Sequence, residues 1–128
     1  MERAAFEQIA AEEFANVSNK LAGKLSNLAL LIEEAGDGAL LGFYRGVPRT
    51  ERGEGYGNLG TLPDTITLFY RPLLGEAEAI VRERRIASYE AVRVAIRETL
   101  WHEIAHHFGM DEDGVSAREE EGTNRYPH

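Results

Sequence analysis

Residues 100–113 read LWHEIAHHFGMDED, and they hold three of the four histidines of the chain. His102, Glu103 and His106 give this segment the pattern HExxH. On a helix, which turns by roughly 100° per residue, the two histidines lie one turn apart and point the same way, with the glutamate beside them. The pattern therefore predicts a helix with two imidazole ligands for one metal ion and a carboxylate that can take a proton from metal-bound water.

The residues before this segment indicate that the same helix face is buried. The inward face is marked by Val92, Ala95, Ile96 and Thr99. His102, Glu103 and His106 fall on the continuation of that stripe. Burying an uncompensated carboxylate costs on the order of several kcal/mol, so a cation beside Glu103 would account for the arrangement.

The residues after the helix supply a third ligand. Gly109 lets the helix end in a left-handed turn, and Asp111 then brings a carboxylate back toward the ion, which completes the pattern HExxHxxGxxD. The chain has no cysteine, so only imidazole and carboxylate remain as strong ligands, and zinc is the expected metal. One glutamate of 119–121 is an alternative third ligand, and His107 is expected to pack or to support a ligand.

Hydrophobic spacing predicts the other elements. Spacings of three and four predict helices, and apolar or alternating runs predict strands. The expected helices are 6–17, 76–85 and 88–108; the expected strands lie within 25–36, 40–47 and 65–70; and 50–64 is expected to be a loop. Because a long loop and Pro72 bound the strand 65–70, we expect it to be an edge strand.

The loop contains a GxGxxG pattern at Gly55, Gly57 and Gly60. A dinucleotide site needs a helix directly after this pattern, but the chain continues into the strand 65–70, so we interpret the glycines as a loop. Tyr56 and Tyr70 are candidates to stabilise an oxyanion, although ordinary packing is the favoured interpretation of both.

Composition limits the class of protein. With 128 residues, 43% of them hydrophobic, residues 1–128 are expected to form a single domain. The net charge of −8 argues against nucleic acid as a partner. The N-terminus lacks the apolar stretch of a secretory signal and no run is long enough to span a membrane, so the sequence favours a cytoplasmic protein with no membrane partner.

The pattern HExxHxxGxxD resembles the metzincin branch of the zincins, in the variant with Asp as the third ligand. More closely, residues 40–75 and 99–113 resemble small single-domain zincin-like metallopeptidases of bacteria and archaea. The resemblance implies an α+β fold, with a small mixed sheet of about 3–4 strands packed on an N-terminal helix and a long active-site helix. It also implies His102, His106 and Asp111 as zinc ligands and Glu103 as general base. The Met-turn of metzincins has no counterpart, since the only methionines are Met1 and Met110.

The resulting expectation is a zinc-dependent metallopeptidase that binds a peptide or protein substrate along the edge strand 65–70. One alternative is a non-catalytic, zinc-stabilised peptide-binding module, although a structural zinc site needs no base at Glu103. Another is a metal-dependent endoribonuclease of the RNA-maturation type, whose motif resembles HGxLHLxGxDH. There a metal-binding histidine stands at the position of Glu112, and a glycine at that of Glu103.

Overall fold

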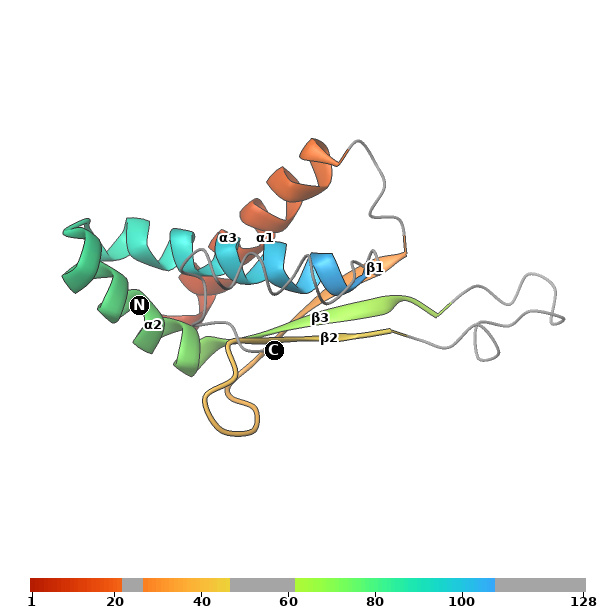
Figure 1. Ribbon diagram of the computed structural model, residues 1–128, viewed down its shortest axis with the longest axis horizontal. Coiled ribbons are helices and arrows are strands. Elements are labelled where there is room, and N and C mark those ends of the chain that lie inside the picture. The colour runs from red at the N-terminus through yellow and green to blue at the C-terminus, as the bar shows by residue number, and fades with distance from the viewer. Residues whose placement is uncertain (22–26, 47–61, 108–128) are drawn as a thin grey trace, which may run out of the picture.

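The computed structural model describes residues 1–21, 27–46 and 62–107. The described residues form three helices and three strands, and Figure 1 shows how they are arranged. Their order is α1 (Arg3–Lys20), β1 (Leu28–Glu33), β2 (Gly42–Arg45), β3 (Asp64–Phe69), α2 (Tyr70–Arg84) and α3 (Ser88–His107).

The three strands form one mixed sheet in the order β1-β3-β2. β1 runs parallel to β3, with Leu30 opposite Ile66, and β2 runs antiparallel to β3, with Tyr44 opposite the same residue. Because side chains alternate between the two faces of a strand, this register places Leu30, Ile66 and Tyr44 on one face of the sheet. The predicted α+β fold with a small mixed sheet is confirmed.

The strand predicted at 65–70 exists, but the prediction that it is an edge strand is wrong. β3 pairs with β1 on one side and with β2 on the other, so it is the central strand. Pro72, which suggested an edge, lies in the first turn of α2, where its missing N–H takes no helical hydrogen bond away. Within the described residues, the strands that pair on one side only are β1 and β2.

The helices follow the sequence prediction with one shift. α1 extends the helix predicted at 6–17 by three residues at each end. α2 begins at Tyr70, six residues before the predicted 76–85, because the chain turns directly from β3 into the helix. It ends at Arg84, and the capping residue Arg85 has a left-handed backbone with a φ of 55°. α3 matches the predicted 88–108 through His107, whereas Phe108, the stop at Gly109 and the loop residues 50–61 lie outside the described residues.

The hydrophobic core lies between the sheet and the helices. In Figure 1, α3 runs along one face of the sheet and α1 crosses behind it. Ile66 and Leu68 of β3 are fully buried in the same cluster as Ile96 and Leu100 of α3. The inward face of α3 is therefore packed against the sheet and buried.

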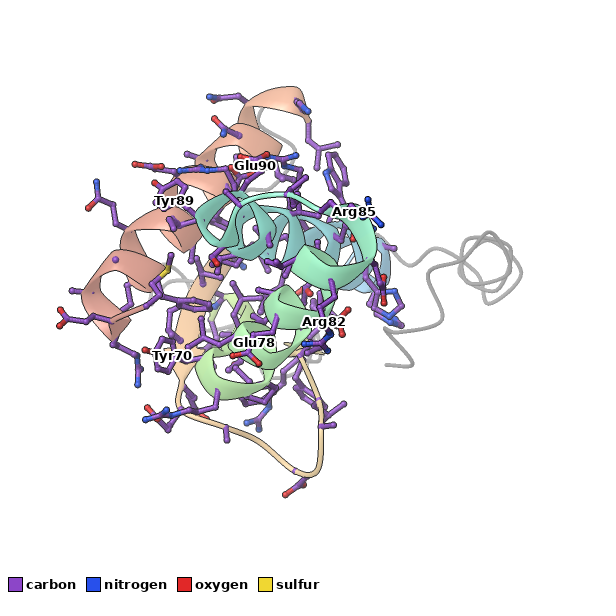
Figure 2. All side chains as sticks on the ribbon, turned by 90° about the vertical axis from the view of Figure 1, so that its left-hand side faces the viewer. Tyr70, Glu78, Arg82, Arg85, Tyr89 and Glu90 are labelled. Carbon is purple, nitrogen blue, oxygen red and sulfur yellow. The ribbon has the colours of Figure 1, made fainter. Side chains whose placement is uncertain are left out.

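The connection between α2 and α3 lies at the far end of α3 from the histidines. Figure 2 shows Arg82 and Arg85 near the end of α2, and Tyr89 and Glu90 on the first turn of α3. Arg84 of α2 also reaches Glu98 of α3, with Nη2 3.0 Å from Oε1. This ion pair joins the two helices at the surface. No helix among the described residues is long and apolar enough to cross a membrane.

Candidate metal centre

The C-terminal half of α3 carries the predicted metal-binding residues on its buried face. Ala95, Ile96 and Thr99 are fully buried, and His102 and Glu103, one turn further along, are 8% and 1% exposed. The structure thus confirms that these polar residues continue the apolar stripe. Polar groups placed at such a depth need a chemical reason, because each loses its hydration.

His102 and His106 lie next to each other in space. Their ring centroids are 5.3 Å apart, and the ring planes are nearly perpendicular at 80°. The Nε2 atoms of both rings are buried and form no hydrogen bond within the described residues, although each residue has other interactions. Two adjacent imidazoles with buried Nε2 atoms fit the nitrogen donors of a zinc site.

Glu103 packs against β2. A Cβ atom added to Gly42 would lie 3.5 Å from Cγ of Glu103 and 2.7 Å from Cγ2 of Thr99, so the backbone of β2 closely approaches α3. Burial raises the pKa of the Glu103 carboxyl to about 8, and a hydrogen bond from the backbone N–H of Tyr44 opposes this rise. A strongly shifted carboxyl beside two histidines is typical of a functional site.

Tyr44 is a site residue that the sequence analysis missed. Its ring lies nearly parallel to the ring of His106, at an angle of 11° and a centroid distance of 6.5 Å. Its hydroxyl donates a hydrogen bond of 2.6 Å to Oδ2 of Asp64, which is 5% exposed. Strand alternation places Gly42 and Tyr44 on one face of the strand predicted at 40–47, but it does not show that this face packs against α3.

Several predicted site residues are not among those that the structure describes. Asp111 and the glutamates 119–121 lie outside the described residues, as do Tyr56 and the side chain of His107. Within 1–21, 27–46 and 62–107, no three His, Asp or Glu side chains are grouped so that they could hold a metal ion. The third zinc ligand thus stays a prediction.

Tyr70 does not belong to this site. Its ring packs edge-on against Phe6, with centroids 5.1 Å apart, and its hydroxyl donates to the carbonyl oxygen of Met1. It lies at the start of α2, whereas the two histidines lie in the C-terminal half of α3. The packing interpretation of Tyr70 is therefore correct.

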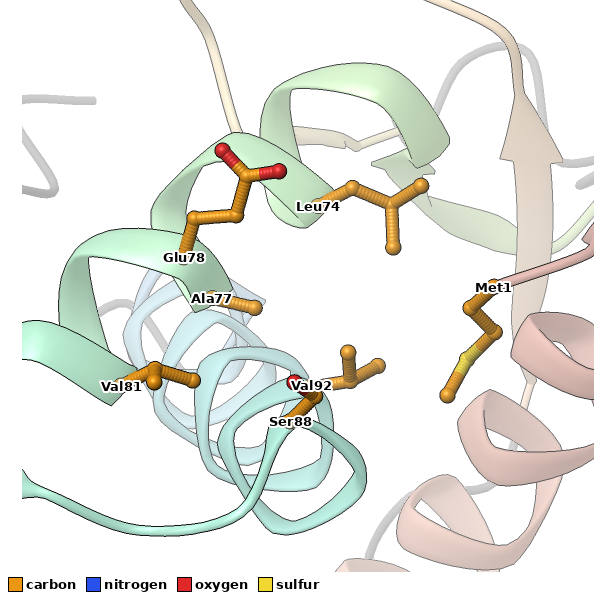
Figure 3. A pocket seen from close by; sticks show the side chains of 7 residues that line it. All are labelled: Met1, Leu74, Ala77, Glu78, Val81, Ser88 and Val92. Carbon is orange, nitrogen blue, oxygen red and sulfur yellow. The ribbon is translucent and has the colours of Figure 1, made fainter.

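A small pocket lies away from the histidines. It has a volume of about 170 Å³ and lies where α2, α3 and Met1 meet. Figure 3 shows the side chains that line it, and these are Met1, Leu74, Ala77, Glu78, Val81, Ser88 and Val92. None of the predicted metal-binding residues is among them, so this pocket is separate from the candidate metal centre.

Comparison with protein families agrees with this geometry. The family of zincin-like metallopeptidases matches residues 25–122. The chain belongs to this family. The zincin-like match begins after α1 and includes the whole sheet, α2 and α3. Zincin-like membership indicates a peptidase that uses zinc, which agrees with the imidazole pair on α3. No curated protein matches the sequence.

Proposed function

We propose that this zincin-like chain is a zinc-dependent metallopeptidase in which His102, His106 and Asp111 hold the metal and Glu103 is the general base. One observation carries the proposal: two adjacent imidazoles and a 1% exposed glutamate lie on one buried helix face, beside a strand. When bound, zinc lowers the pKa of a coordinated water and polarises the carbonyl group of the substrate. The tasks left to the protein are to orient the ligands, to accept a proton and to align the peptide.

Glu103 is placed for the proton transfer. On α3, one proposed ligand comes directly before Glu103 and the second comes three residues later. Its carboxylate would therefore stand beside an ion held by the two imidazoles and could accept a proton from water bound there. The backbone N–H of Tyr44 donates to this carboxylate and so limits its orientations. Burial keeps bulk water from competing for the proton.

β2 is the strand that we propose for substrate binding, in place of 65–70. Within the described part of the chain it pairs with β3 alone, and it packs on α3 next to Glu103. An extended peptide can add to such an edge through backbone hydrogen bonds, with alternate side chains pointing toward the protein. The proposed partner is still a peptide or protein. The strand proposed to bind it is now β2 and no longer β3.

The test combines metal content with cleavage. Purified protein is analysed for zinc by mass spectrometry and incubated with a denatured-protein library, next to the variant Glu103→Gln. We expect one zinc per chain in both proteins and a fall in cleavage of about 10²–10⁴-fold in the variant, since it keeps the ligands but lacks the base. Glu90→Gln is the matched control, because it makes the same change at an exposed position of α3 and leaves cleavage unchanged.

The outcomes separate the competing functions. If the wild type cuts no peptide that Glu103→Gln leaves intact, the peptidase proposal fails. Stoichiometric zinc without cleavage would instead support the peptide-binding module. If His102→Ala binds zinc with full affinity, the ligand assignment is wrong.

A further inference from the structure

We infer that Tyr44 is a positioning residue that fixes the orientation of the zinc ligand His106. The inference rests on the proposed function, and it adds a residue outside the HExxH helix. Tyr44 is on β2 and reaches α3 because Gly42, two residues earlier on the same face, has no side chain to hold the strand away. It contacts the site from the sheet side.

Tyr44 lies beside the proposed ligand His106. The rings of Tyr44 and His106 lie at an angle of 11° with centroids 6.5 Å apart, while His102 meets His106 edge-on at 80°. His106 therefore has one nearly parallel ring and one nearly perpendicular ring as neighbours. Rotation of the imidazole about its side-chain bonds changes its packing against both rings.

A hydrogen bond to the central strand holds the side chain of Tyr44 in place. Its hydroxyl donates to Oδ2 of Asp64 at 2.6 Å, a length typical of a hydrogen bond to a charged oxygen. Asp64 is 5% exposed and is the first residue of the central strand, and its backbone N–H donates to the carbonyl oxygen of Asn27 at 3.1 Å. The tyrosine ring is held at its backbone end by β2 and at its hydroxyl end by β3.

The consequence is a preoriented ligand. Groups that hold a metal-binding histidine in place typically change metal affinity by about 10–100-fold when they are removed. Tyr44→Leu removes the ring and is expected to weaken zinc binding by about 10–100-fold. Tyr44→Phe keeps the ring but loses the bond to Asp64, so a smaller loss of a few-fold is expected.

The experiment measures zinc affinity by competition with a chromogenic chelator, with Phe43→Leu as the matched control. Phe43 is the neighbour of Tyr44 on β2, but it points to the opposite face and is 39% exposed. We expect the order wild type, Tyr44→Phe and Tyr44→Leu in decreasing affinity, and Phe43→Leu equal to wild type. Thermal unfolding of the metal-free proteins identifies any variant that fails to fold.

A second readout needs neither zinc nor activity. NMR of the His106 ring in metal-free protein is expected to show one ordered conformation in the wild type and faster rotamer averaging in Tyr44→Leu. Tyr44→Phe gives the same comparison with the ring retained, should Tyr44→Leu not fold. Unchanged zinc affinity or an unchanged His106 ring in a folded Tyr44 variant would overturn the inference. A wild type that cuts no peptide would overturn the proposed function alone.

Discussion

Two buried glutamates lie at different positions around α3, and their surroundings differ. Glu13 comes from α1 and is 2% exposed, whereas Glu103 belongs to α3 itself and is 1% exposed. Glu13 receives hydrogen bonds from two guanidinium groups, with Nη1 of Arg93 at 2.7 Å and Nε of Arg97 at 2.8 Å. Glu103 accepts a hydrogen bond from the backbone N–H of Tyr44.

The two carboxyl groups therefore have opposite pKa shifts. Burial alone would raise the pKa of Glu13, but the hydrogen bonds from Arg97 and Arg93 outweigh it and hold the pKa below the usual 4.5. At Glu103 burial dominates and raises the pKa to about 8. The fold stabilises the charge of the first carboxylate and disfavours the charge of the second. A structural role fits Glu13, and proton transfer fits Glu103.

The largest expected effect on stability comes from Glu13→Ala. Removing this carboxylate leaves two guanidinium groups beside a buried gap between α1 and α3. Breaking a buried ion pair costs roughly 3–5 kcal/mol, and since the Arg97 side chain is 40% exposed we expect a loss of about 2–3 kcal/mol. Urea unfolding of the metal-free protein measures it. Glu103→Gln should stay within about 1 kcal/mol of wild type, because its amide oxygen can still accept the Tyr44 N–H.

Glu12→Ala is the control for this comparison. Glu12 accepts a hydrogen bond from Nη2 of Arg93 at 2.8 Å, but its side chain is 46% exposed, so its loss should destabilise the protein far less than the loss of Glu13. If Glu12→Ala destabilises as much as Glu13→Ala, burial is not what distinguishes the α1 contact. If Glu103→Gln is the more damaging of the two glutamate changes, the assignment of structural and functional roles is reversed.

A smaller effect is expected where β2 touches α3. The Cβ of Gly42→Ala would lie 2.7 Å from Cγ2 of Thr99 and 3.2 Å from the carbonyl oxygen of Thr67. Such overpacking costs about 1–3 kcal/mol and moves the strand that holds Glu103. Thr99→Ser removes the methyl group that clashes. We therefore expect the double variant to lose less stability than the sum of the single variants, measured by urea unfolding.

Gly75→Ala is the matched control for the glycine change. Gly75 lies within α2, and a Cβ there meets no heavy atom within 4 Å. Alanine should leave stability unchanged or raise it by up to about 1 kcal/mol, because glycine is the poorer helix former. Additive losses in Gly42→Ala and Thr99→Ser would show that the approach of β2 to α3 does not depend on this contact.

Local patterns predicted the half of the site that lies on one helix. The apolar spacing from Val92 onward correctly placed His102 and Glu103 on the buried face, since helical geometry alone fixes that relation. The sheet order was not available in this way. Alternation in 65–70 predicted a strand with one buried face, but it contains no information on how many neighbours the strand has, and Pro72 was misleading because it belongs to α2.

Tyr44 and Asp64 could not be found from spacing, because their relation to the site is tertiary. Twenty positions separate them in the chain, and they meet only through the pairing of β2 with β3. Gly42 shows the same limit, since a glycine that permits close packing looks like any other glycine in the sequence. Sequence spacing identified the residues of the HExxH helix that we propose for the chemistry. It did not identify Tyr44 and Asp64, which we propose to position them.

The smallest expected effect is a difference in acid sensitivity. Because the folded pKa of Glu13 lies below its unfolded value near 4.5, its contribution to stability is fully present above pH 4.5. That contribution is lost as the pH falls through the folded pKa. Urea unfolding as a function of pH should therefore show a steeper loss of stability below pH 4.5 in wild type than in Glu13→Gln, which has no proton to gain.

This difference should be only a fraction of the loss in Glu13→Ala, because solvent near the half-exposed Arg97 weakens the interaction. Added salt should reduce it only in part, since the Glu13 side chain is 3% exposed and ions approach it poorly. Parallel curves for wild type and Glu13→Gln below pH 4.5 would mean that the two arginines do not stabilise the charge of Glu13.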